Sequence, residues 1–247
     1  MVTFSDLGRY GRFGNQLFQI ASTIGIAKAN GYDYGFPEWV NHDARDRFGA
    51  KEDVEVGKWF ANELPRSPDG YPFGNHYISW GWQGLNHPDG VSYAGHMQSE
   101  KYFAHCHDLI QDTFTLKDEW KPINYTAIHI RMGDYGGDYH PICSKWYYAE
   151  AMKVLRGPYM VFSDDIVKAK EMLQPFMGAH DIFDNGTTLS SFRAMKACRA
   201  HIIANSTFSW WAAWLAGGDV VAPKAWFGPA AADLETKDIY PDKWVII

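Results

Sequence analysis

The chain has 247 residues, of which 46% are hydrophobic and 21% charged. This composition excludes a disordered chain, and no apolar run reaches the roughly 18 residues that a membrane-spanning helix needs. The net charge of −6 argues against broad contact with nucleic acid. Three scattered cysteines and the lack of a recognisable signal peptide predict a cytoplasmic protein, for which peripheral contact with a membrane stays open.

The first predicted elements surround the opening segment LGRYGRFGNQLFQIA. Residues 2–6 predict a strand, and the three regularly spaced glycines that follow predict a loop. Residues 17–27 predict a helix, with Asn15 at the position of its cap. The glycine spacing matches neither the dinucleotide fingerprint nor the Walker loop. A loop between a strand and a helix directs N–H groups and a helix dipole at one point, which suits an anion. A tight turn without any ligand is the alternative.

The next part of the chain is rich in Gly, Pro and aromatic residues and predicts loops rather than regular strands. Residues 91–114 predict a short strand, a glycine turn and a helix from about Ser99. Residues 117–124, KDEWKPIN, are polar and contain a proline, which is typical of a linker. We therefore expect two domains, residues 1–118 and 119–247.

The second half alternates strands and helices in a regular way. This alternation predicts an α/β fold with a parallel sheet and right-handed crossovers. The expected strands are residues 125–130, 159–165, 180–184, 200–206 and 219–226. The expected helices are residues 144–155, 166–176, 188–199, with Thr188 as the cap, and 207–217.

Polar residues follow three of these strands, at 131–134, 163–165 and 205–207. Ligands of parallel sheets bind outside the carboxyl ends of the strands, so these segments are candidates for one site. Arg131 offers a planar fork of donors that suits a diphosphate. The alternative is an arginine that pairs with a neighbouring aspartate.

Two further segments allow several interpretations. The carboxylates of Asp164 and Asp165 suit a divalent metal, a cap for the following helix, or the N–H donors of guanine. Ser206 and Thr207, at a helix start after a strand, suit a phosphate. The three tryptophans that follow have the spacing of a buried helix face.

Five segments, GRFGNQLFQIA, GHMQSEKYF, HIRMGDY, FSDD and NSTFSWWAAWL, together resemble, in the same order, signature segments of glycosyltransferase family 11, the α-1,2-fucosyltransferases. They span residues 11 to 215, and the first and third are also distantly similar to segments of α-1,6- and protein O-fucosyltransferases. The resemblance implies a GT-B-like fold, in which two Rossmann-like domains with mostly parallel sheets face a cleft. Residues 1–118 would take the acceptor side and residues 119–247 would bind GDP-fucose. The implied activity is inverting transfer of L-fucose, without a metal or other cofactor, to a galactose 2-OH of a glycan acceptor.

The resemblance also implies roles for single residues. Arg131 would bind the diphosphate and stabilise the GDP leaving group. The other implied donor-binding residues are His129 and one of Asp164 and Asp165 on the guanine side, Asn205, Ser206, Thr207 and Phe208 near the β-phosphate, and Arg12, Gly14 and Asn15 from the first domain.

The general base stays open at this point. Asp138 is the first candidate, Asp134 the second and Glu100 the third, and a dissociative reaction needs no strong base.

Three positions depart from the family pattern. Met132 replaces the usual second arginine, and Ile20 and His96 stand where aromatic residues are common. Two alternative functions stay open. One is a metal-dependent glycosyltransferase that uses another nucleotide sugar and binds its metal through the paired aspartates. The other is a carbohydrate-binding homologue with impaired catalysis.

Overall fold

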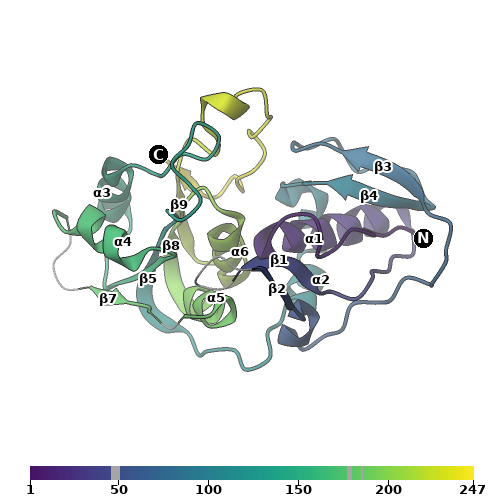
Figure 1. Cartoon of the computed structure of the whole chain (residues 1–247), viewed down its shortest axis with the longest axis horizontal. Coiled ribbons are helices and arrows are strands. Elements are labelled where there is room, and N and C mark those ends of the chain that lie inside the picture. The colour runs from purple at the N-terminus through teal and green to yellow at the C-terminus, as the bar shows by residue number, and fades with distance from the viewer. Residues whose placement is uncertain (46–50, 177–179, 185) are drawn as a thin grey trace. The chain divides into compact units, whose positions relative to one another are not determined.

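The computed structural model describes residues 1–45, 51–176, 180–184 and 186–247, which form two compact units (Figure 1). Unit 1 comprises Met1–Lys117 and Glu235–Pro241. Unit 2 comprises Asp118–Leu234 and Asp242–Ile247. The chain thus leaves unit 1 at the start of the polar segment 117–124, and a short later segment returns to it.

Unit 2 is built on a six-stranded parallel sheet with the order β10-β9-β8-β5-β6-β7. Counted along the chain within this unit and read from β7, the order is 3-2-1-4-5-6, as in the Rossmann fold. The predicted α/β class is confirmed. The strands are β5 (Ile123–Ile130), β6 (Tyr159–Ser163), β7 (Asp181–Ile182), β8 (Cys198–Ile202), β9 (Asp219–Ala222) and β10 (Val245–Ile246).

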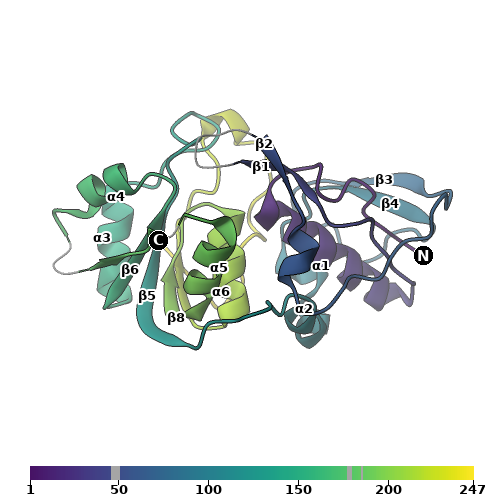
Figure 2. The ribbon, with the colours of Figure 1, turned by 60° about the horizontal axis from the view of Figure 1, so that its bottom comes forward.

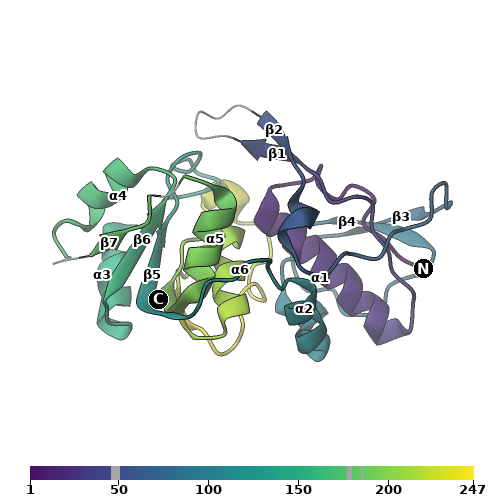
Figure 3. The same cartoon turned by 90° about the horizontal axis from the view of Figure 1, so that it is seen from below.

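Helices cover both faces of this sheet, as Figures 2 and 3 show. One face carries α3 (Lys145–Val154) and α4 (Ile166–Leu173), and the other carries α5 (Thr188–Ala197) and α6 (Thr207–Ala216). A 3₁₀ turn at Pro229–Ala231 completes the regular elements.

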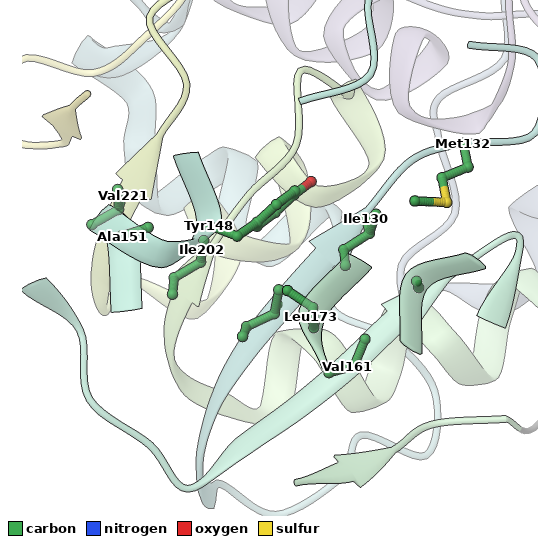
Figure 4. Packing of buried hydrophobic residues seen from close by; sticks show 10 residues of the cluster. Ile130, Met132, Tyr148, Ala151, Val161, Leu173, Ile202 and Val221 are labelled. Carbon is green, nitrogen blue, oxygen red and sulfur yellow. The ribbon is translucent and has the colours of Figure 1, made fainter. Parts of the chain in front are cut away.

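Apolar side chains of β5, β6, β8 and β9 pack against α3 and α4 in one core (Figure 4). Met132 belongs to this core and is only 6% exposed. An arginine in its place would carry a charge into an apolar environment. Burial of even an uncharged polar group without a hydrogen bond costs roughly 2–7 kcal/mol, and burial of an unpaired charge costs more. The departure from the family pattern at this position is therefore compatible with the packing of unit 2.

The tryptophans of α6 form the buried face that their spacing predicts. Trp210 and Trp211 are fully buried and Trp214 nearly so. Their rings contact one another, and Trp210 also contacts Trp244 at 5.3 Å between centroids. They serve the core of unit 2 rather than a ligand.

Unit 1 contains the long helix α1 (Phe13–Asn30), which runs alongside a small parallel sheet of β3 (Gly74–Ile78) and β4 (Val91–Gly95) in Figures 1 and 3. Its other elements are the antiparallel pair β1 (Asn41–Arg45) and β2 (Lys51–Val54), helix α2 (His107–Thr113), and 3₁₀ turns at Val56–Trp59, Glu100–Tyr102 and Ala104–Cys106. Among the described residues, no helix has the length and apolar character needed to cross a membrane.

Several expectations for unit 1 are wrong in detail. The segment 2–6 forms only bridges at Val2 and Thr3, because the chain turns from Phe4 to Leu7, where the Leu7 N–H donates to the Phe4 carbonyl. Asn15 is not a cap, since α1 begins at Phe13 with Arg12 in the capping position.

The helix expected from Ser99 is also different. It is two 3₁₀ turns followed by α2, and the Ser99 side chain accepts a hydrogen bond from the Lys101 N–H at the first turn.

In unit 2 the corrections are shifts of boundaries. Thr187, not Thr188, caps α5, and its Oγ1 accepts a hydrogen bond from the Ser190 N–H at 3.1 Å. The next strand begins at Cys198 and ends at Ile202, so residues 203–206, expected as the end of this strand, lie in a loop.

Candidate functional site

The three polar segments of unit 2 follow neighbouring strands, because β5 lies between β8 and β6 in the sheet. Strand order reverses at β5, with later strands added on both sides. In open α/β sheets such a switch point is where ligands bind. The expectation that these segments belong to one edge of the sheet is thus met within unit 2.

Arg131 lies directly after β5 and is held from three sides. Its Nη1 is 2.7 Å from Asp164 Oδ2, and its Nη2 hydrogen-bonds Asp134. The guanidinium carbon is 5.4 Å from the ring centroid of Tyr135, a cation–π contact. The structure therefore shows Arg131 paired with neighbouring aspartates, which is the alternative that the sequence left open.

Asp164 organises the loop that carries Arg131. Its Oδ1 accepts a hydrogen bond from the Met132 N–H at 2.8 Å, and its Oδ2 accepts one from the Gly133 N–H at 3.0 Å. A Cβ atom at residue 133 would lie 2.6 Å from Asp164 Oδ2, which explains glycine at this position. Both carboxylate oxygens are thus engaged with the backbone, in addition to the arginine.

Asp165 has the capping role that was one of its three interpretations. Its Oδ1 accepts a hydrogen bond from the Lys168 N–H at 3.1 Å, and its Oδ2 is 2.8 Å from Lys168 Nζ. Hydrogen bonding by the Lys168 side chain holds the pKa of Asp165 below its usual range. In the described part of the chain, no group of three or more His, Cys, Asp and Glu side chains has metal-binding geometry.

His129 connects the end of β5 to the first turn of α6. Its Nδ1 is 2.8 Å from Ser209 Oγ, and its backbone carbonyl accepts a hydrogen bond from the Tyr148 hydroxyl at 3.0 Å. Burial lowers the pKa of His129 to about 4, so the ring is neutral at pH 7. The Phe208 ring lies 5.8 Å from the imidazole, between centroids.

The first turn of α6 contains the residues expected near a phosphate. Ser206 is the N-cap residue, and its side chain makes no capping bond to the helix. Thr207 and Phe208 follow it as the first helical residues. The N-terminus of α6, the positive end of its dipole, therefore follows the loop after β8. Strand β8 lies next to β5, the strand that Arg131 follows.

Asn205 holds loops together. Its side-chain amide donates hydrogen bonds to the carbonyls of Pro141 and Trp226, both at 3.0 Å, and its Oδ1 accepts from Cys143 Sγ. Its backbone carbonyl accepts from the Tyr135 hydroxyl at 3.0 Å. This buried residue fixes the loops around the site, a role the sequence did not reveal.

The two candidate bases lie in the Arg131 loop. Asp134 is bound to Arg131 and its side chain is about half exposed. Asp138 is exposed, and its backbone carbonyl accepts a hydrogen bond from the Ala230 N–H at 3.1 Å. Gly228 is needed beside it, because a Cβ there would lie 2.2 Å from that carbonyl oxygen.

The remaining candidates belong to unit 1. Arg12, Gly14 and Asn15 lie at the start of α1. Asn15 Oδ1 accepts a hydrogen bond from Gln98 Nε2 at 3.1 Å, which ties this helix start to the segment after β4. Glu100, the third candidate base, begins a 3₁₀ turn after that segment.

Two residues that were not expected from the sequence, Tyr135 and His140, lie next to Arg131 or against its neighbour. Tyr135 lies under the guanidinium, and the His140 ring stacks on Tyr135 at 4.8 Å with an interplanar angle of 12°. Burial lowers the pKa of His140. The only feature of the sequence that points to them is the repetition of aromatic residues in DYGGDYH, residues 134–140.

The chain is similar in sequence to several known proteins. The model of glycosyl transferase family 11 matches residues 91–247. An α-1,2-colitosyltransferase from Escherichia coli is 31% identical over 183 residues, which cover 64% of this chain and 62% of that protein. The galactoside α-(1,2)-fucosyltransferase 2 of Mus musculus is 24% identical over 246 residues, covering 85% of this chain and 68% of that protein. The chain thus spans less than two thirds of the length of the E. coli relative.

A solved structure supports the fold. The crystal structure of POFUT1 in complex with GDP matches with a TM-score of 0.52 and 13% identity, over 87% of this chain and 93% of that one. At this identity the likeness shows a shared fold, in agreement with the expected GT-B-like architecture.

Proposed function

Because the chain belongs to glycosyltransferase family 11, we propose that it transfers L-fucose from GDP-fucose to a hydroxyl of a glycan acceptor. The observation that carries this proposal is Arg131, fixed at the switch point of the parallel sheet beside the start of α6. The names of the relatives, an α-1,2-fucosyltransferase and an α-1,2-colitosyltransferase, support transfer of a sugar to a 2-hydroxyl.

The geometry suits a diphosphate. Asp164 is three-quarters buried and holds one guanidinium nitrogen, whereas Asp134 is about half exposed and holds the other. A diphosphate can therefore replace Asp134 as a partner while Asp164 keeps the guanidinium in place. The positive end of the α6 dipole then adds to the stabilisation of the phosphate charge.

The proposed reaction is a single displacement with inversion. A galactose 2-OH attacks C1 of the β-linked fucose, the bond from C1 to the diphosphate oxygen breaks, and GDP leaves with the electron pair. Arg131 and the α6 N-terminus stabilise the charge that develops on the leaving phosphate. Asp138, or Asp134 once Arg131 binds the donor, accepts the proton of the hydroxyl.

We propose that no metal or other cofactor takes part. The two carboxylates that would hold a divalent ion are bound instead to Arg131 and backbone N–H groups, and to Lys168. Arg131 supplies the positive charge that a metal supplies in other nucleotide-sugar transferases.

The test is fucosyl transfer to lactose by the wild type and by Arg131→Ala and Arg131→Lys. Loss of one preorganised donor typically lowers turnover by about 10²- to 10³-fold, and we expect that loss for Arg131→Ala with unchanged thermal unfolding. Arg131→Lys keeps the charge but not the bidentate fork, so its rate should lie between the two. Wild-type turnover by Arg131→Ala would refute the role of Arg131.

A second candidate concerns the donor sugar. The E. coli relative is named for colitose, so the same assay includes a nucleotide-linked colitose donor. Faster turnover with colitose than with fucose would replace L-fucose in the proposal and leave the role of Arg131 intact.

A further inference from the structure

Three parallel segments of unit 1 end at one edge, and each is followed by an aromatic ring. Thr3 pairs in parallel with Ser92 of β4, and β4 pairs in parallel with β3. Tyr10 lies in the loop after the first segment, His96 directly after β4, and Trp80 two residues after β3. This edge is where the parallel arrangement of unit 1 would place a ligand.

These three rings are in contact, and we call them the aromatic stack. The Trp80 and His96 ring centroids are 3.9 Å apart with an interplanar angle of 18°, a stacked pair. The Tyr10 and His96 centroids are 4.8 Å apart at 38°. Tyr10 is 39% exposed, and Trp80 and His96 are partly exposed.

The backbone at His96 is held in an unusual conformation. Gly95 has φ +119° and Met97 has φ +47°, a region that L side chains rarely adopt. Ser22 Oγ donates a hydrogen bond to the Met97 carbonyl at 3.0 Å, and so ties the strained residue to α1. Strain of this kind persists where the surrounding structure fixes it, and it concentrates at binding sites.

Polar atoms of the same segment lack partners. Among the described residues, His96 Nδ1 and Gln98 Oε1 are buried without a hydrogen bond, and Gln98 is only 3% exposed. Buried polar groups are usually paired, so such a cluster calls for an explanation. Gln98 Nε2 also donates a hydrogen bond to Asn15 Oδ1, which connects the segment that carries His96 to the start of α1.

We propose that the aromatic stack of Tyr10, Trp80 and His96 binds a neutral sugar ring of the acceptor, whose C–H face packs on the exposed aromatic surface. This inference rests on the proposed function and names the acceptor subsite of the same enzyme. A sugar ring offers apolar C–H groups that suit the faces of these rings.

The chemistry of the stack favours an uncharged ligand. None of its three side chains is cationic at neutral pH, because burial lowers the pKa of His96 to about 4. A phosphate or a carboxylate-bearing sugar would gain no charge partner from these rings. A galactose or glucose unit of an uncharged glycan meets their requirements.

The experiment compares Trp80→Ala and Tyr10→Ala with Tyr77→Ala, which removes a more exposed aromatic ring from β3 in the same unit. The readouts are KM for lactose, KM for GDP-fucose, and saturation-transfer NMR of lactose without donor. Loss of one aromatic contact should raise KM for lactose by roughly five- to tenfold in both stack variants. Tyr77→Ala should match the wild type, and KM for GDP-fucose should stay unchanged in all three. Trp80→Phe, which keeps an aromatic face, should recover most of the affinity.

Wild-type KM for lactose in both stack variants would overturn the inference, as would an equal rise in KM for GDP-fucose. A variant that fails to fold is replaced by the other, because Tyr10 and Trp80 lie on different segments. Lactose signals in the wild type that vanish in Trp80→Ala, without any transfer, would support the stack while refuting the proposed activity. Transfer with unchanged lactose affinity would refute the stack alone.

Discussion

Replacing Asp164 by Asn changes one oxygen into an NH₂ group and leaves the size of the side chain unchanged. In the wild type the two carboxylate oxygens accept the Met132 and Gly133 N–H groups and pair with Arg131. An amide keeps one acceptor oxygen. In one orientation the NH₂ group faces the Met132 N–H, and in the other it faces the Gly133 N–H and Arg131. In both orientations Arg131 loses its ionic partner, because the amide carries no charge.

The magnitude follows from these contacts. A hydrogen bond to a charged group contributes about 1.5 to 3 kcal/mol, and the pair is largely shielded, with Arg131 20% and Asp164 25% exposed. We therefore expect a loss of about 2 to 3 kcal/mol in the positioning of Arg131. At 1.36 kcal/mol per decade this corresponds to a decrease of about 30- to 150-fold in kcat/KM for GDP-fucose.

The neighbouring Asp165 provides a matched control. Asn is as good an N-cap as Asp, so Asp165→Asn should keep α4 and retain activity within about twofold. The assay is GDP release from GDP-fucose with lactose as the acceptor, together with thermal unfolding of each variant. Equal losses in the two variants would refute the reasoning, because they would indicate that the carboxylate pair acts as one binding site for a metal or for guanine.

Three further predictions concern residues of unit 2. Gly133→Ala should lower the rate of transfer by about tenfold or more, because its Cβ would displace the Asp164 carboxylate that holds Arg131. Gly137→Ala is the control and should keep the wild-type rate, because the space around its Cβ is open. Asn205→Ala should lower the free energy of unfolding by about 2 to 4 kcal/mol in urea, since it leaves one buried and one partly buried carbonyl without donors; an unchanged midpoint would contradict its role in joining loops. His201 is fully buried, and burial lowers its pKa to about 4. The unfolded chain therefore binds a proton at His201 more readily than the folded chain. The stability that the neutral ring contributes is lost as the pH falls from about 6.5 toward 4. His201→Gln should therefore lose less stability than the wild type between pH 7 and pH 5, by about 2 kcal/mol in urea titrations, and an equal loss in the two proteins would contradict this reasoning.

The sequence predicted much of unit 2 because its signals are local. Apolar runs of strand length alternate with helical patterns, and an arginine follows the first apolar strand. Parallel sheets place such residues at one edge, so Arg131 could be nominated without knowledge of the register. The family itself was predicted from the order of five segments, and the comparisons confirm it.

The contacts that decide roles could not be predicted in this way. Asp164 and Gly133 are 31 residues apart, and their hydrogen bond depends on the register of β5 against β6. Asn205 was expected to bind the donor, yet its amide is used between loops, a fact that only the packed structure reveals.

Unit 1 was less accessible to prediction for a different reason. Its parallel segments are short, and several pair only through single bridges, so periodicity is weak. The aromatic stack joins rings from three distant loops. The cytoplasmic location and the independence from cofactors stay predictions.

The central claim is tested most directly by the structure of the product. Wild-type protein, GDP-fucose and lactose are incubated with an excess of chelator, and the products are identified by NMR. The account predicts one GDP released for each fucose transferred, with an α-linkage to the galactose 2-OH, and no such product with Arg131→Ala. A β-linked product, a reaction that starts only when a divalent ion is added, or equal turnover by Arg131→Ala would contradict it.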